Sequence, residues 1–158
     1  MTVSAGTRPG IGSYILFMVA STTYALPSSE VRHIEMLEEI TRVPNAPPFV
    51  DGAVFSRGQV VPVVNLRARF GFERALFDLK TRLIVVQAGA RLIGLVADSA
   101  HEFVSIPPDA IQPPNEALAG MSGRYVDGIA SVRDRLILVL NLDRILNFAE
   151  AQTVGLGQ

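Results

Sequence analysis

The stretch FVDGAVFSRGQVVPVVNL, residues 49–66, recurs as YVDGIASVRDRLILVLNL, residues 125–142. The two segments align without gaps, 76 residues apart, and Val-Asp-Gly, an arginine, a central valine and Asn-Leu are identical. Most other pairs place one apolar residue on another. Each segment has two short apolar runs around a polar turn, a pattern typical of a β-hairpin. The fold is therefore built on a repeated hairpin.

An earlier block of the chain repeats as well, at an offset of 69 residues. The aligned pairs are 24–27 with 93–96, Val31 with Ala100, and Ile34 with Phe103. Two blocks that recur in the same order indicate a duplication, with a longer connection in the second copy. We place the copies at roughly residues 13–75 and 80–148. We expect both to form a single domain over 13–148, with flexible ends at 1–12 and 149–158.

Short runs rich in Val, Ile and Leu dominate both copies, and Gly, Asn, Asp or Pro bound most of them. These lengths and flanks favour strands, about five for each copy. A unit of roughly 60 residues has little core of its own, so the two units should bury apolar surface against each other. Five-stranded sheets of this size close into small barrels, which removes exposed edges. Pro62 lies inside one run and predicts an edge or a bulge there.

Three short helices are predicted between the strands. Asn65 and Asn141 precede helix-compatible residues at 66–70 and 142–146, and an asparagine side chain is a good helix N-cap. Residues 28–34 resemble a single helical turn capped by Ser28. The fold class predicted from these patterns is all-β with short helices, arranged as two duplicated barrels.

The composition excludes several classes of function. Hydrophobic residues make up 49% of the chain and charged residues 18%, with a formal net charge of −1, so no basic surface indicates nucleic-acid binding. The chain has no cysteine, which removes disulfides and thiolate sites. It has no signal-peptide pattern, and its apolar runs are far shorter than the roughly 20 residues that span a bilayer. We expect a cytoplasmic protein without direct membrane insertion.

The sequence offers no support for catalysis, a metal or a cofactor. Lys80 is the single lysine and has no P-loop glycine before it. His33 matches no metal-ligand spacing, and His101 has no serine or cysteine nucleophile in a suitable context. Both histidines are interpreted as polar surface residues. The prediction is a protein that is not an enzyme and that holds no cofactor.

The polar turn at Ser56-Arg57-Gly58-Gln59 is the strongest candidate for a binding site. Arg57 should stand on a hairpin tip, where its planar guanidinium can bind a partner's carboxylate. Gly58 supplies the positive φ that such a tight turn requires. Since Arg133-Asp134 occupies the same turn in the second copy, an arginine suited only to the hairpin is the alternative.

These residues resemble the CheW family, the coupling proteins of bacterial chemosensory arrays. The resemblance covers about residues 13–148 and is carried by these segments: VPNAPPFVDG at 43–52, Arg57-Gly58, VPVV at 61–64, Leu66-Arg67, Phe70-Gly71, GLVAD at 94–98, Pro113-Pro114 and 136–146. It implies two SH3-like five-stranded barrels. It also implies an adaptor that joins the cytoplasmic tips of chemoreceptors to the regulatory domain of a CheA-type histidine kinase, and so is recruited to membrane-bound receptor arrays.

The resemblance also implies a set of protein-binding residues. Arg57, with Gly58 beside it, matches the family's functionally sensitive arginine. Four further positions are expected around a groove between the barrels, where a receptor helix would bury its apolar stripe: Val31, Leu83, Ile93 and Gly94. Plain core packing is the alternative for each of these four.

The chain departs from the family pattern at several places. The usual Asn-Leu-Arg-Gly is here Phe55-Ser56-Arg57-Gly58, and His33 stands where an acidic residue is common. Asn65 replaces the usual aspartate, which caps a helix equally well. Residues 111–118 lack the basic and bulky residues of some relatives, which puts extended ring contacts in doubt.

Two alternatives to the chemotaxis adaptor remain open at this stage. The altered Ser56 and His33 are compatible with a CheW-like adaptor of a non-flagellar system, for surface sensing, pilus motility or development. A small-molecule sensor or enzyme that uses the groove between the barrels belongs to a different class.

Overall fold

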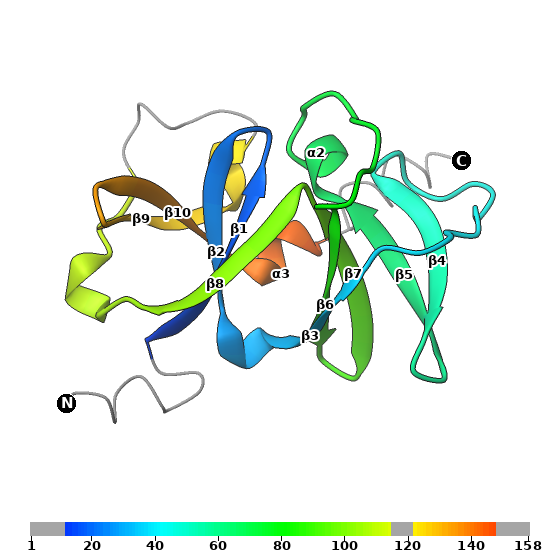
Figure 1. Cartoon of the computed structure of the whole chain (residues 1–158), viewed down its shortest axis with the longest axis horizontal. Helices are drawn as coiled ribbons and strands as arrows, with labels where there is room; N and C mark the ends of the chain where they lie inside the picture. The colour runs from blue at the N-terminus through cyan, green and yellow to red at the C-terminus, as the bar shows by residue number, and fades with distance from the viewer. Residues whose placement is uncertain (1–11, 115–121, 148–158) are drawn as a thin grey trace.

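A computed structural model describes residues 12–114 and 122–147 (Figure 1). The predicted flexible ends, 1–12 and 149–158, fall almost wholly outside these ranges. The strands are β1 (Ser13–Val19), β2 (Thr22–Pro27), β3 (Val31–Met36), β4 (Val50–Ser56), β5 (Gln59–Asn65), β6 (Arg82–Ala88), β7 (Arg91–Ala97), β8 (Ser99–Ser105), β9 (Val126–Val132) and β10 (Arg135–Leu140). The helices are η1 (Ser28–Glu30), α2 (Leu66–Arg69), η2 (Pro108–Ala110), η4 (Ser122–Tyr125) and α3 (Leu142–Ile145).

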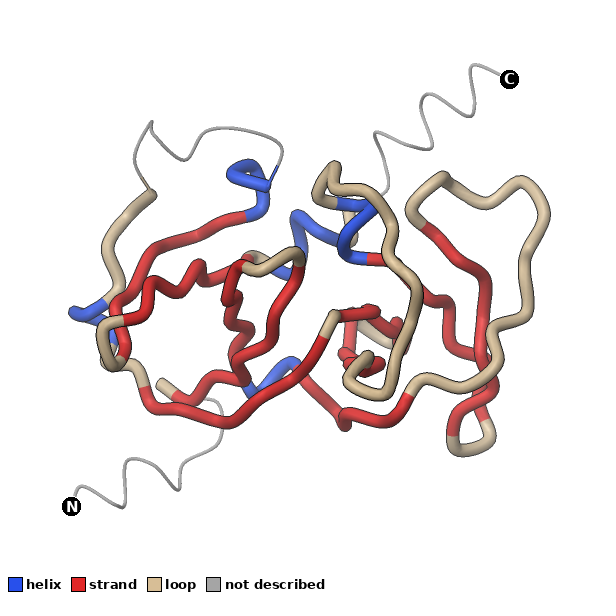
Figure 2. Tube along the Cα trace, turned by 45° about the horizontal axis from the view of Figure 1, so that its top comes forward, coloured by secondary structure: helices blue, strands red, loops and turns tan. Residues whose placement is uncertain are grey.

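The strands form two five-stranded sheets with matching topology, which confirms the predicted duplicated β fold. One sheet has the order β8-β1-β2-β10-β9 and the other the order β3-β6-β7-β5-β4. We call them barrel A and barrel B. They lie side by side in Figure 1, and the strands of barrel A curl into a ring in Figure 2.

The two barrels do not follow the two sequence copies. Barrel A takes β1 and β2 from the first copy and β8 to β10 from the second, while barrel B takes β3 to β5 from the first and β6 and β7 from the second. The division expected near residues 75–80 therefore does not separate the barrels. The chain crosses between them twice, through η1 after β2 and through Asp98 after β7. Because the copies are alike, a hairpin of one copy can pair with the last three strands of the other.

Each sheet closes on itself through one short bridge. Thr41, which follows β3, exchanges both backbone hydrogen bonds with Ala53 of β4, at 2.9 and 2.8 Å. Gln112 exchanges the equivalent pair with Ile129 of β9, at 2.8 and 2.7 Å. The closure satisfies backbone groups that an open edge would leave unpaired.

The repeated Val-Asp-Gly and Asn-Leu segments act together in each barrel. The glycine lies beside the closing bridge: a Cβ on Gly52 would overlap the Thr41 carbonyl. The aspartate accepts a hydrogen bond from the asparagine that ends the next strand, at 2.9 Å between Asp51 and Asn65. Asn65 in turn accepts from the Ala68 amide and caps α2. The residues that are identical in the two copies are therefore those that close the barrel and cap the helix.

The predicted helices are present with one correction. Asn65 and Asn141 cap the single-turn helices α2 and α3, as expected. Residues 28–34 are not one helix, because only Ser28–Glu30 are helical and no side chain caps them. From Val31 the chain is strand β3, which pairs with β6. The β-branched residues there gain more from the sheet than from a helical turn.

Pro62 lies in β5, which is an interior strand rather than an edge. It stands opposite Ala53, whose backbone N–H and C=O both bond to Thr41, so β4 requires no donor from Pro62. Pairing of β5 with β7 begins only at Val63. The proline therefore occupies a place in the sheet where no backbone N–H is needed.

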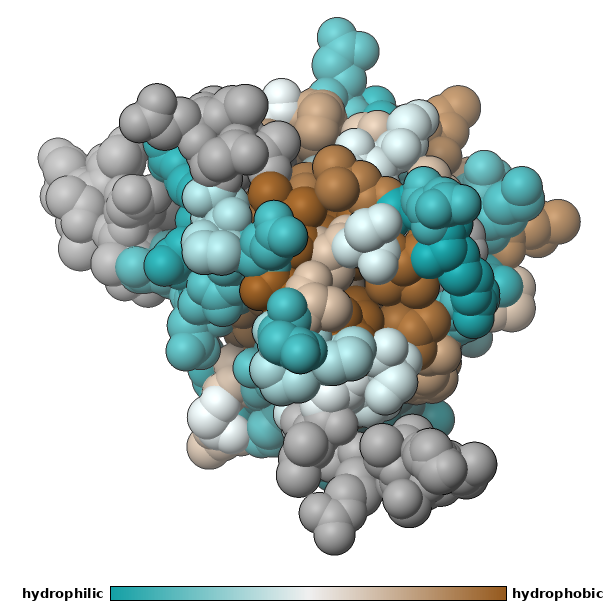
Figure 3. All heavy atoms as spheres, turned by 90° about the vertical axis from the view of Figure 1, so that its left-hand side faces the viewer, coloured by the Kyte–Doolittle hydropathy of each residue, from teal (hydrophilic) through white to brown (hydrophobic). Residues whose placement is uncertain are grey.

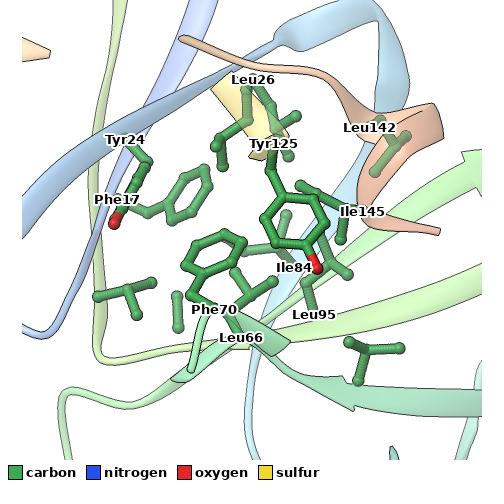
Figure 4. Packing of buried hydrophobic residues seen from close by; sticks show 14 of the residues in the cluster. Phe17, Tyr24, Leu26, Leu66, Phe70, Ile84, Leu95, Tyr125, Leu142 and Ile145 are labelled. Atoms are coloured by element: carbon green, nitrogen blue, oxygen red, sulfur yellow. The ribbon is translucent and has the colours of Figure 1, made fainter. Parts of the chain in front are cut away.

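The largest apolar cluster lies between the barrels rather than inside either of them. It combines residues of both sheets with α2, α3 and η4. Four aromatic rings form a row across it, with centroid separations of 6.2, 5.1 and 5.4 Å, in the order Phe17, Tyr24, Phe70 and Tyr125 (Figure 4). Smaller clusters fill each barrel. The expectation that the two units bury apolar surface against each other is confirmed.

Arg69 of α2 links this helix to α3 by hydrogen bonds across the shared core. Its buried guanidinium donates from Nε to the Ile145 carbonyl at 2.8 Å and from Nη2 to the Asn147 carbonyl at 3.0 Å. It also lies over the ring of Phe49, 4.3 Å from the centroid. The carbonyls at the end of α3, which have no helical partner, are thus satisfied by a cation.

Asp98 fixes the second crossing between the barrels. Its carboxylate accepts hydrogen bonds from Arg67 Nε and Nη2 at 2.9 and 2.7 Å and from the Ala20 amide at 2.9 Å. Burial alone would raise the pKa of Asp98, but the hydrogen bonds from Arg67 and Ala20 outweigh it, and the pKa lies below its usual value. The charged form of Asp98 therefore stabilises the fold.

Replacing Gly52 with alanine should destabilise the protein by about 3 kcal/mol or more, because the new Cβ meets backbone rather than a movable side chain. The matched control is Gly89→Ala in the β6–β7 turn, where φ is also positive but the added Cβ has open space, and it should cost about 1 kcal/mol. Urea unfolding measures both. Equal losses would contradict the assigned closure at Gly52.

Asp98→Asn should lower stability by roughly 1 kcal/mol at pH 7, since the ion pair is only partly buried. A depressed pKa means that the contribution of wild-type Asp98 is complete above the unfolded-state value of about 3.9 and is lost as the pH falls through the folded-state value. The difference between the two proteins should therefore shrink below about pH 4. Thermal unfolding between pH 3 and 7 measures it, and a constant difference would contradict this account.

Candidate protein-binding site

The β4–β5 hairpin carries the arginine singled out in the sequence. Ser56 pairs with Gln59, and the two residues between them have φ values of 51° at Arg57 and 83° at Gly58. Two successive positive φ values are typical of a type I′ turn, which matches the twist of paired strands. The predicted positive φ at Gly58 is confirmed. Both residues are exposed at the tip of the hairpin.

An apolar pair flanks this arginine on the outer face of the hairpin. Phe55 and Val60 stand opposite each other, and their side chains are 75% and 70% exposed. Val54 and Ser56 point the other way and are buried, as the alternation of a strand requires. Aromatic residues and arginine are both enriched at protein interfaces.

The equivalent β9–β10 hairpin differs in both respects. Arg133 has the same turn conformation, with φ of 52°, but its Nη1 lies 2.8 Å from Glu102 Oε2. The cross-strand pair beside it is Ser131 and Leu136, of which Leu136 is 60% exposed. Seen from the end of the molecule where barrel A lies, apolar side chains gather in the middle of the face, with hydrophilic ones around them (Figure 3).

Behind the first hairpin, three polar side chains form a cluster that the sequence analysis missed. Glu35 Oε2 accepts a hydrogen bond from Ser56 Oγ at 2.8 Å and lies 2.6 Å from His33 Nε2. Ser56 is buried, and the His33 side chain is 14% exposed. His33 and Glu35 lie two residues apart on β3, so their side chains share one face of that strand. Ser56 lies 21 residues beyond Glu35 in the chain, and only the closed barrel brings it into contact with them. The departures at His33 and Ser56 noted in the sequence are thus neighbours in space.

The four predicted groove residues divide into two kinds. Leu83 and Ile93 are 1% and 2% exposed and belong to apolar clusters, and Gly94 is buried where an added Cβ would lie 2.6 Å from Leu83 Cδ1. Core packing accounts for these three. Val31 is half-buried where the chain enters β3, and packs against the shared core. It alone of the four retains a partly accessible side chain.

Other polar side chains of the described residues also pair with one another. In a hollow below α2, Asp51 pairs with Arg74 at 2.9 Å and accepts from Asn65. Among residues 12–114 and 122–147, no three His, Asp or Glu side chains are placed to hold a metal ion. No helix in the same ranges is long and apolar enough to cross a bilayer. His101 lies in β8, and its side chain is outside the part of the chain described.

Two barrels packed on a shared core, with exposed apolar residues on their hairpins, have the character of a protein-binding module. The model of the CheW-like domain matches residues 13–150, most of the chain, and the protein belongs to the CheW family.

The chain is similar along its length to known members. It is 26% identical to the chemotaxis protein CheW of Klebsiella aerogenes, covering 97% of this chain and 93% of that protein. It is 29% identical to the protein FrzA of Myxococcus xanthus, covering 97% and 96%. The crystal structure of the scaffolding protein TtCheW from Thermoanaerobacter tengcongensis superposes with a TM-score of 0.80, at 28% identity and over 87% of this chain and 93% of that one.

Proposed function

We propose that this protein is a non-catalytic adaptor that couples the cytoplasmic signalling tips of chemoreceptors to a CheA-type histidine kinase. The observation that carries the proposal is the β4–β5 hairpin, where an exposed arginine stands beside an exposed aromatic ring on a barrel of the CheW family. Two similar proteins, named as a chemotaxis protein and as a scaffolding protein, support the same role. Binding to receptors that span the membrane would recruit it to their arrays.

We assign the hairpin to the kinase regulatory domain. The guanidinium of Arg57 suits a carboxylate on the partner, and Phe55 with Val60 suits an apolar patch next to it. We assign the junction around Val31 to the apolar stripe of a receptor helix, since this half-buried residue lies where the two barrels meet. One partner on each surface would let a single chain bridge the two.

The polar cluster at His33, Glu35 and Ser56 favours a second candidate, an adaptor of the same kind in a non-flagellar chemosensory system. The cluster changes the residues directly behind the proposed kinase hairpin. The similarity to FrzA of Myxococcus xanthus also extends over nearly the whole length of both proteins. Binding to kinases encoded beside its gene, compared with a kinase of a flagellar cluster, separates the two.

Arg57→Ala should weaken binding to the kinase regulatory domain about tenfold or more, because a central arginine at an interface is often a hot spot. Its melting temperature should shift by less than about 2 °C, since the exposed side chain makes neither a hydrogen bond nor an ion pair with the described residues, 12–114 and 122–147. Arg133→Ala, at the equivalent turn, is the matched control for an arginine on a hairpin tip. Calorimetric titration and thermal unfolding measure both variants. A large loss of stability would make Arg57 structural.

Phe55→Ser installs the residue that the second copy carries at this position, Ser131. It should weaken kinase binding by about tenfold because an exposed apolar anchor is removed. Stability should change by less than about 0.5 kcal/mol, as for other surface substitutions. Leu136→Ser, on the β9–β10 hairpin, is the control for loss of an exposed apolar residue. Equal effects of the two variants on kinase binding would refute the assignment of the first hairpin.

A further inference from the structure

The duplication allows each residue of barrel B to be compared with its equivalent in barrel A. Ile34 of β3 pairs with Ile84, and Phe103 of β8 pairs with Ile15. Ile34 and Phe103 are 69 residues apart, and so are Ile15 and Ile84, so the two pairs are equivalent. His33 and Glu102, which directly precede these residues, therefore occupy the same place in the two barrels. Arg57 and Arg133 likewise share the first position of equivalent turns, with φ of 51° and 52°.

In barrel A these two positions form an ion pair. Glu102 Oε2 lies 2.8 Å from Arg133 Nη1 and 4.0 Å from Arg135 Nη2. In barrel B the place of the carboxylate is taken by His33. Within the described part of the chain, residues 12–114 and 122–147, Arg57 has neither a hydrogen bond nor an ion pair. The copy with Glu102 thus has an arginine that is neutralised, at Arg133, whereas the copy with His33 has an arginine that is available, at Arg57.

Barrel B does have a carboxylate near this hairpin, but it is occupied. Glu35 is held from two sides, by His33 Nε2 at 2.6 Å and by Ser56 Oγ at 2.8 Å. Since Glu35 accepts a hydrogen bond from Ser56, the residue directly before Arg57, its carboxylate lies beside the turn that carries the arginine. With side chains of Glu35 and His33 only 29% and 14% exposed, solvent competes weakly for this contact.

We propose that His33 is a positioning residue that keeps Arg57 free for a partner by holding Glu35 against Ser56. Removal of His33 releases Glu35 to pair with Arg57, as Glu102 pairs with Arg133 in the other barrel. An internal ion pair competes with the partner's carboxylate for the same guanidinium donors. His33 therefore sets the strength of binding at the first hairpin without touching the partner. Only the identity of that partner rests on the function proposed above.

The decisive experiment first examines the protein alone. In wild type, the Arg57 Nε–H signal in a ¹⁵N-resolved NMR spectrum should show fast exchange with water. In His33→Leu it should shift and exchange several-fold more slowly, because the guanidinium gains a carboxylate. In His33→Leu/Glu35→Gln it should return to its wild-type behaviour. His33→Gln, which keeps a donor to Glu35, should behave like wild type. An unchanged Arg57 signal in His33→Leu would overturn the proposal, whether or not any kinase binds.

The same four proteins are then titrated with the isolated regulatory domain of the kinase encoded beside the gene. His33→Leu should weaken binding about fivefold to tenfold, and adding Glu35→Gln should restore it. If the double variant stays weak, His33 contacts the partner directly and the proposal is wrong. If wild type itself fails to bind, the proposed function fails while the NMR result still decides the role of His33. Thermal unfolding of each variant, with melting temperatures within about 3 °C of one another, separates these effects from misfolding.

Discussion

The shared apolar core between the barrels is the constraint on which the rest of the structure depends. Each barrel alone encloses only a small cluster, whereas the cluster between them draws on both sheets and on the short helices. The row of aromatic rings and the buried Arg69 lie in this layer. Because the barrels are fixed against each other there, the outward-facing hairpins keep a defined separation. A fixed arrangement of binding surfaces is what a scaffold protein requires.

The hairpins illustrate how a duplicated fold acquires two different surfaces. The backbone of both turns is the same, so geometry alone does not distinguish them. The difference lies in which groups satisfy the arginine: Glu102 in one barrel, and no described group in the other. A surface ion pair of this kind contributes little to stability. Its greater effect is on what each hairpin can offer to another protein.

Much of this architecture could be predicted from the repeat. The identical Val-Asp-Gly and Asn-Leu segments predicted two equivalent units with capped helices, because the closing glycine and the capping asparagine have local requirements that the sequence displays. The exchange of hairpins between the copies could not be predicted. Since β1 and β6 have similar apolar patterns, either could pair with β3 or with β8, and only the crossings at η1 and Asp98 decide between them.

The turn that carries Arg57 was predicted from the sequence, whereas the polar cluster behind it was missed because it depends on strand register. Gly58 indicated the tight turn at Arg57, and the turn places that residue outside the barrel. Leu83 and Ile93 were expected near a groove, but both are buried in the core. An apolar residue in a strand gives the same sequence pattern whether it faces a partner or the core. The contact of His33 and Glu35 with Ser56 depends on how a closed barrel aligns β3 with the end of β4, which no local pattern records.

The exchange of strands also determines the order in which the chain can fold during synthesis. Barrel B comprises one continuous stretch, from Val31 to Ala97, whereas barrel A is assembled from the two ends of the chain. As the chain leaves the ribosome, β1 and β2 emerge first but have no barrel to join until β8 to β10 follow. Barrel B can close in the meantime and present its half of the shared core as a template. The nascent protein must therefore keep its first apolar hairpin from aggregating until its last strands arrive.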